Sequence, residues 1–155
     1  MNYKKWAAIV AAILLGLTFF VAGLGKLPAQ TEAYMIIFGL QRALLHPTLA
    51  NHLDTWLPRI EIILGLLLMV GVAAKLMAGF AGLLSVAFIF NNSWEIARGA
   101  GGDPCGCYGD NSFLGYLSNT DALYIDIGML ALAIVIILWY SGKWLSARPW
   151  FIKNS

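Results

Sequence analysis

Charged residues are scarce in this chain of 155 residues. Asp, Glu, Lys and Arg make up 12% of it, whereas soluble domains carry about 25%. Hydrophobic residues make up 60%, and the mean hydropathy is +0.75. A small soluble fold cannot bury so much apolar surface, but a lipid bilayer accommodates it. The composition therefore excludes an ordinary soluble domain and predicts an integral membrane protein with the lipid bilayer as its surroundings.

Basic clusters are also missing. The formal net charge is only +2, and no run of Lys and Arg alternates with aromatic residues as nucleic-acid binding would require. Nucleic acids are therefore excluded as partners. The chain has only two histidines and two cysteines, so few positions can carry metal or redox chemistry.

Four apolar stretches predict four membrane helices. The first follows Lys4 and Lys5 and is longer than the roughly 7–15 apolar residues of a signal peptide, so we expect a retained transmembrane helix. Between Glu61 and Glu95 the only charge is Lys75, and this interval is too long for one crossing of about 20 residues. It predicts a hairpin that turns near residues 71–75.

The resulting fold class is all-α: a single polytopic membrane domain over residues 1–155, with a bundle of four transmembrane helices. The expected helices cover residues 6–25, 60–74, 76–96 and 122–140. Candidate N-cap residues precede the last helix: Asn119, Thr120 and Asp121. Between the first two helices, the apolar residues of the loop 26–59 predict an outward amphipathic or partly re-entrant segment.

The distribution of Lys and Arg predicts the orientation. With four spans, one side holds the basic residues Lys4, Lys5, Lys75, Lys143, Arg148 and Lys153, and the other holds Lys26, Arg42, Arg59 and Arg98. The richer side is cytoplasmic by the positive-inside rule. In a bacterial-type cytoplasmic (inner) membrane, both termini would then be cytoplasmic. The loops 26–59 and 98–121 would face outward, into an oxidising compartment.

The two cysteines lie close together in the glycine-rich sequence Cys105-Gly106-Cys107-Tyr108-Gly109. A disulfide needs its Cα atoms about 5.5–6 Å apart, so closure requires a bend at Gly106. A small, strained and exposed ring is labile and oxidising, whereas a structural bridge usually closes a longer loop. The spacing favours redox exchange. A structural bridge, a metal site and inert thiols remain as alternatives.

A metal site would need further ligands. His46 and His52 lie in the other outward loop and could complete a set of two cysteines and two histidines with Cys105 and Cys107. Neither spacing is a usual zinc pattern. The ordinary interpretation of both histidines is solvated loop residues near the lipid headgroups.

Three acidic residues are expected at membrane depth toward the outer side: Glu61, Glu95 and Asp126. Intramembrane ionisable residues are costly, and they are usually paired or functional. They could relay protons for thiol oxidation, or bind a quinone headgroup together with Trp94 and Tyr108. The alternative is that they form structural ion pairs with the nearby basic residues Arg59, Arg98 or Lys26.

Three segments carry a resemblance to a known family: Phe20-Val21-Ala22-Gly23-Leu24-Gly25-Lys26-Leu27, Leu57-Pro58-Arg59-Ile60-Glu61-Ile62-Ile63-Leu64-Gly65 and Cys105-Gly106-Cys107-Tyr108-Gly109. With the four predicted spans, the chain resembles the MauE/DoxX family of small membrane proteins. The Cys-Gly-Cys-aromatic-Gly element points to the MauE branch. The resemblance implies a redox role outside the cytoplasm: MauE-like proteins are linked with a thioredoxin-like partner and methylamine dehydrogenase maturation, and DoxX-like proteins with thiol or thiosulfate oxidation that feeds quinone.

Three functions follow as hypotheses. In the first, Cys105 and Cys107 cycle between dithiol and disulfide, exchange with an external thioredoxin-like protein and pass electrons to a quinone. In the second, the chain is a non-catalytic accessory subunit of a larger membrane complex, and the cysteines form a stable bridge. The third, a small-solute transporter, fits poorly because four spans with few polar residues make a poor aqueous pathway.

Overall fold

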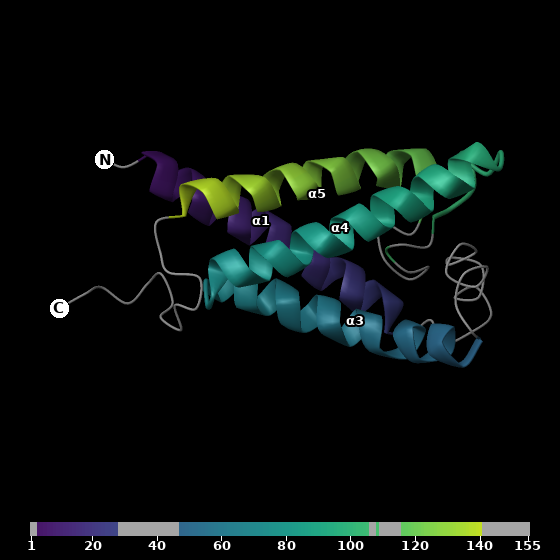
Figure 1. Ribbon diagram of the computed structural model, residues 1–155, viewed down its shortest axis with the longest axis horizontal. Helices are drawn as coiled ribbons and strands as arrows, with labels where there is room; N and C mark the ends of the chain where they lie inside the picture. The colour runs from purple at the N-terminus through teal and green to yellow at the C-terminus, as the bar shows by residue number, and fades with distance from the viewer. Residues whose placement is uncertain (1–2, 28–46, 106–107, 109–115, 141–155) are drawn as a thin grey trace.

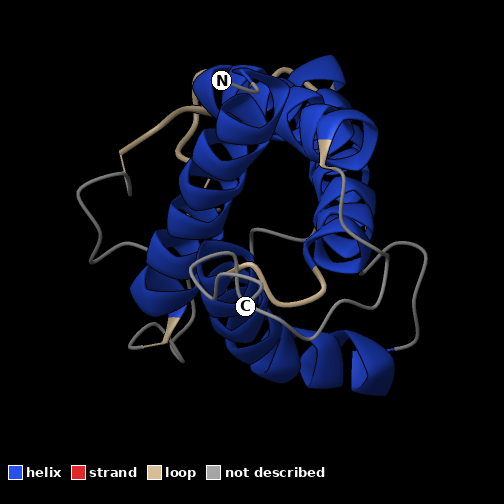
Figure 2. Cartoon of the chain, turned by 90° about the vertical axis from the view of Figure 1, so that its left-hand side faces the viewer, coloured by secondary structure: helices blue, strands red, loops and turns tan. Residues whose placement is uncertain are grey.

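The computed structural model describes residues 3–27, 47–105, 108 and 116–140. Four helices make up most of this part (Figure 1): α1 (Tyr3–Lys26), α3 (Pro47–Val70), α4 (Ala74–Ala97) and α5 (Asn119–Trp139). Seen from the end where the chain begins, the described residues form helices joined by loops, with no strand among them (Figure 2). The all-α prediction is therefore confirmed.

Successive helices run in opposite directions. As a result α1 and α4 finish, and α3 and α5 begin, at the same end of the bundle, which we call the loop end (Figure 1). The turn between α3 and α4 lies at the opposite end. It occupies Gly71–Ala73, inside the predicted hairpin, and both Gly71 and Ala73 have positive φ angles, of 81° and 47°.

Three of the four helices, α1, α4 and α5, are long and apolar enough to cross a membrane. The remaining helix, α3, carries Arg59 and Glu61 near its middle, and its uncharged part ends at Val70. This helix begins at Pro47 rather than at the predicted Ile60. The predicted span is thus the apolar second half of a longer helix, and its crossing of the membrane stays a prediction.

Glycines bring α1 and α3 into close contact. A Cβ atom on Gly16 would lie 2.7 Å from the carbonyl oxygen of Gly65, and one on Gly65 would lie 2.5 Å from that of Gly16. A Cβ on Gly23 would lie 2.7 Å from the carbonyl oxygen of Pro58. Small residues at such crossings let two backbones approach closely in a membrane. The two helices therefore pack backbone to backbone over several turns.

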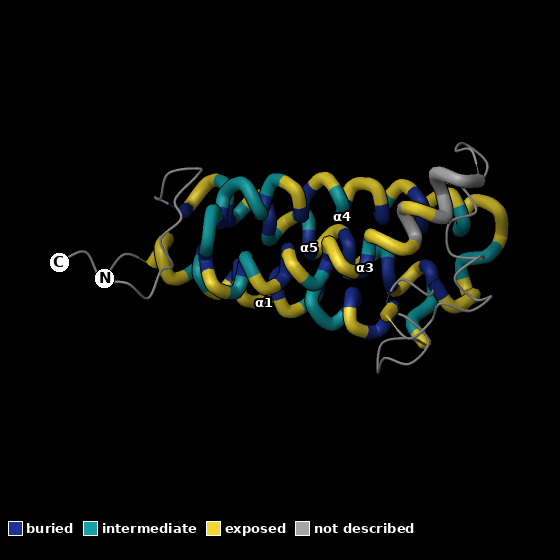
Figure 3. Tube along the Cα trace, turned by 90° about the horizontal axis from the view of Figure 1, so that it is seen from below, coloured by how far each residue is buried: buried dark blue, intermediate teal, exposed yellow. Residues whose placement is uncertain are grey.

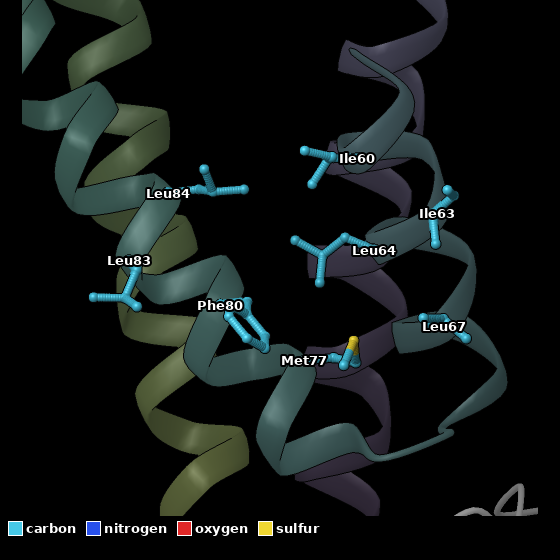
Figure 4. Close-up of a pocket in the computed structure, with 8 residues that line it drawn as sticks. All are labelled: Ile60, Ile63, Leu64, Leu67, Met77, Phe80, Leu83 and Leu84. Atoms are coloured by element: carbon cyan, nitrogen blue, oxygen red, sulfur yellow. The ribbon is translucent and has the colours of Figure 1, made fainter. Parts of the chain in front are cut away.

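The four helices pack mainly as two pairs, α1 with α3 and α4 with α5, and α1 also contacts α5. Buried positions of each helix face the inside of the bundle (Figure 3). Contact between α3 and α4 is sparse. An apolar groove of about 410 Å³ lies between these two helices (Figure 4), lined by Ile60, Ile63, Leu64, Leu67, Met77, Phe80, Leu83 and Leu84.

The helix ends at the loop end are capped by local sequence. After α4, Gly99 has a φ of 89°, and the amides of Gly99 and Ala100 bond back to the carbonyls of Ile96 and Glu95, a pattern that favours glycine. The N-cap of α5 is Ser118, which forms a reciprocal capping box with Asp121. The three predicted N-cap candidates, Asn119, Thr120 and Asp121, are therefore wrong, because they form the first three helical positions and Asp121 acts at the third.

Candidate functional site

A buried ion pair joins α1 to α3 near the loop end. The ammonium of Lys26, the last residue of α1, lies 2.6 and 2.9 Å from the two carboxylate oxygens of Glu61. Both side chains are almost fully buried, with 2% and 0% exposed. Helical side chains lean toward the N-terminus of their helix, so Lys26 reaches back into the bundle. Its ammonium also lies 5.1 Å from the centre of the Phe88 ring on α4.

A second buried polar contact joins α4 to α5. The side-chain amide of Asn92 donates a hydrogen bond of 2.8 Å to the Asp126 carboxyl. Asn92 is fully buried and Asp126 is 3% exposed. Asp126 is close enough to Lys26 and Glu61 to interact electrostatically with both. The end of the bundle thus holds a cluster of one base, two acids and an amide, and we call these four residues, Lys26, Glu61, Asn92 and Asp126, the polar cluster.

The loop after α4 is tied to the start of α5. The amide of Cys105 donates to the Leu117 carbonyl at 2.9 Å, and the amide of Asn119 donates to the Asp103 carbonyl at 3.0 Å. The Asn119 side chain adds a bond of 2.7 Å to the Ala100 carbonyl. These bonds give Pro104 and Ser118 an isolated antiparallel bridge. The backbone of the first cysteine is therefore held in a defined position.

This attachment turns Cys105 into the bundle. Cys105 is 4% exposed and belongs to a small buried cluster with Ala22 of α1, Tyr108 and Ala122 of α5. The hydroxyl of Tyr108 lies 4.0 Å from the sulfur of Met129, deeper along α5. Cys107 lies outside the described residues. The first cysteine of the motif is thus a core residue, whereas the sequence predicts an exposed pair.

The remaining predicted site residues are not drawn into the polar cluster. Trp94 is 42% exposed. Glu95 is partly buried, and its buried Oε1 atom has no hydrogen-bond partner among the described residues. Of the alternative metal ligands, His52 is exposed on α3, and His46 lies outside the described residues with Cys107. The described part of the chain contains no group of three or more His, Cys, Asp or Glu side chains suited to a metal ion.

Two of the predicted acids, Glu61 and Asp126, have different hydrogen-bond partners and can therefore play different roles. Glu61 is bound by both oxygens to a cation, which is the ion-pair alternative with Lys26 as the partner. Asp126 has a neutral amide as its described hydrogen-bond partner, so its carboxyl can exchange a proton without breaking an ion pair. Asn92 was not predicted as a site residue. Its signal was present, since Asn91 and Asn92 are adjacent amides within an otherwise apolar stretch.

The comparisons with known proteins give one result. A family model described as "Methylamine utilisation protein MauE" matches residues 4–140, which include the cysteine motif and all of the four described helices except the first residue of α1. No curated protein matches the chain, and no solved structure matches it either.

Proposed function

The chain belongs to the MauE family of membrane proteins, and from this premise we propose that it exchanges disulfides with a thioredoxin-like protein through Cys105 and Cys107. Its apolar helices and its family make it a multi-pass membrane protein. We further propose that α3 is the fourth span, because the pairing of Glu61 with Lys26 offsets the cost of its charge in the bilayer. The motif would face outward in a bacterial inner membrane, with both termini cytoplasmic.

The burial of Cys105 carries the proposal and divides the roles of the two cysteines. A partner protein can attack, or be attacked by, only a sulfur that it can reach. Cys105 is 4% exposed and is held by its backbone bond to Leu117. We therefore assign Cys107 as the residue that forms the mixed disulfide with the partner, and Cys105 as the residue that resolves it.

The exchange proceeds in two balanced steps. The Cys107 thiolate attacks one sulfur of the partner's disulfide, and the partner's other sulfur leaves as a thiolate. The Cys105 thiol then loses its proton and attacks the sulfur of Cys107, which releases the partner's remaining sulfur as a thiolate. The partner gains two electrons, and this chain loses them as the Cys105–Cys107 disulfide forms. The reverse sequence oxidises the partner.

Trapping the mixed disulfide tests this assignment. The variants Cys105→Ser and Cys107→Ser are expressed in membranes with an excess of a thioredoxin-like domain whose second cysteine is replaced by Ser and whose first cysteine carries a nitrothiobenzoate disulfide. Attack on this disulfide releases nitrothiobenzoate, so the partner keeps no thiolate that could reverse the step, and the adducts are separated without reductant. We expect a stable adduct with Cys105→Ser, because Cys107 remains but cannot be resolved, and no adduct with Cys107→Ser. Equal adducts from both variants, or none from either, would overturn the proposal.

The second candidate is an accessory subunit of a larger membrane complex, with a permanent bridge between the cysteines. The apolar groove between α3 and α4 favours it, because sparse contact between two apolar helices leaves a face for another membrane helix. Co-purification of the double variant, with Ser at both cysteines, would separate the candidates. An intact complex with full activity in its host membrane would support the accessory role and exclude an essential exchange.

A further inference from the structure

We propose that the Asp126 carboxylate accepts the proton of the Cys105 thiol during the resolving step and returns it when the reaction runs in reverse. Asn92 positions the Asp126 carboxyl, and Tyr108 covers that carboxyl. This inference rests on the proposed function. It assigns different roles to two of the acids predicted from the sequence: Asp126 takes the proton of the redox step, and Glu61 forms a structural ion pair with Lys26.

The first argument is the register of α5. Its buried residues Ala122, Asp126 and Met129 follow each other by four and then three positions, so they form one stripe on one face of the helix. Two described residues of the segment after α4 contact both ends of this stripe. Cys105 and Tyr108 cluster with Ala122, and the Tyr108 hydroxyl reaches the Met129 sulfur. Asp126 therefore lies between these two contact points, one turn from the position at which Cys105 packs.

The second argument concerns the surroundings of the Asp126 carboxyl. From α4 it accepts a hydrogen bond from Asn92. Lys26 of α1 and Glu61 of α3 act on it electrostatically, but they are bonded to each other by two contacts. Among the described residues of the polar cluster, Asp126 is thus the acid without a cationic hydrogen-bond partner. A carboxyl in such a site can accept a proton from a neighbouring thiol and return it.

The third argument is the burial of Cys105. The thiolate is the reactive form of cysteine, and Cys105, with only 4% of the residue exposed, has little direct access to water. Its proton therefore needs a protein acceptor during the reaction. The stripe on α5 supplies one in Asp126, which is itself only 3% exposed.

The test isolates the resolving step with a small reagent. A dithiobis(nitrobenzoate) is added to the purified, reduced protein in lipid nanodiscs. One coloured aryl thiolate is released when Cys107 attacks, and a second is released when Cys105 closes the disulfide. The two phases are followed by absorbance as a function of pH, in water and in deuterium oxide. The variants are Asp126→Asn and Asp126→Glu, with Asp103→Asn as the matched control.

We expect Asp126→Asn to slow the second phase at neutral pH by about 100-fold, the lower range for assisted proton transfer, and to leave the first phase unchanged. Asp126→Glu should restore much of the rate, and the solvent isotope effect of the second phase should disappear in Asp126→Asn. Asp103 is exposed and stands two residues before Cys105, so Asp103→Asn removes a carboxylate nearby in sequence and should change neither phase.

Two results would overturn the inference. If Asp126 merely repels the thiolate, Asp126→Asn will speed the second phase, because a negative charge has been removed. If Asp126 is only a packing residue, Asp126→Asn will leave the rate and the isotope effect as they are. Failure of the partner-trapping experiment while the first aryl thiolate is still released would count against the proposed function, and not against the proton path.

Discussion

Removing Lys26 is expected to destabilise the bundle strongly. The change Lys26→Met keeps most of the apolar side chain but removes the ammonium that lies 2.6 and 2.9 Å from the Glu61 oxygens, so the Glu61 carboxylate stays buried with no cation. Breaking a buried ion pair from one side typically costs about 3–5 kcal/mol. Loss of the contact between the ammonium and the Phe88 ring adds to this cost.

A double variant distinguishes the loss of the whole ion pair from the burial of a single unpaired charge. Lys26→Met combined with Glu61→Leu removes both charges, and replacing a whole buried pair with apolar residues is often neutral or stabilising. We therefore expect the double variant to be more stable than either single variant. Arg59→Met is the matched control, because Arg59 is exposed and bonds to its own helix, so its loss should cost less than about 1 kcal/mol.

The assay is reversible unfolding in mixed micelles, with the denaturing detergent as the titrant and the fluorescence of the six tryptophans as the signal. The free energy of unfolding is compared across five proteins: the unchanged chain, Lys26→Met, Glu61→Leu, their double variant and Arg59→Met. A cost below about 1 kcal/mol for Lys26→Met would refute the reasoning. Additive costs in the double variant would do the same, since they would show that the two side chains do not depend on each other.

Three further predictions concern packing and capping. Gly65→Ala should destabilise the protein by about 1–3 kcal/mol, because the added methyl group would overlap the backbone of α1. Gly79 has open space around it, so Gly79→Ala should stabilise α4 by about 0.5–1 kcal/mol. The same unfolding assay measures both changes. Ser118→Ala should cost about 0.5–2 kcal/mol by removing the capping box of α5, seen as faster hydrogen exchange in its first turn. Asn92→Leu should cost about 1–3 kcal/mol, because the buried Asp126 carboxyl loses its donor, and Asp126→Leu in the same background should recover part of that loss.

Local patterns predicted the helices well. Apolar runs of membrane length predicted α1, α4 and α5, and the length of the interval between Glu61 and Glu95, with Lys75 as its only charge, predicted the hairpin. Hydropathy does not reveal the start of α3, because polar residues interrupt its first half; the start signal there is Pro47 at the first helical position. Helix formation depends on neighbours in the sequence, and this is why these features could be predicted.

For contacts between residues far apart in the chain, the sequence limits the possible partners but does not identify the actual one. Lys26 was one of three cations offered to Glu61, and the two are separated by 35 positions in the chain. Which cation pairs with Glu61 depends on how α1 and α3 are rotated about their axes, and that is decided by the glycine contacts between them. The burial of Cys105 was not predicted for a similar reason, since it results from backbone pairing with Leu117 across the loop.

The grouping of the helices into two pairs determines where the bundle can open without breaking its buried polar contacts. Each pair has its own internal electrostatic partner: Lys26 and Glu61 belong to α1 and α3, and Asn92 and Asp126 belong to α4 and α5. Widening of the seam between α3 and α4 would leave both of these bonds intact. Cys105 packs on the opposite seam, between α1 and α5, so lipid or a neighbouring helix could enter one side while the sulfur on the other side keeps its place.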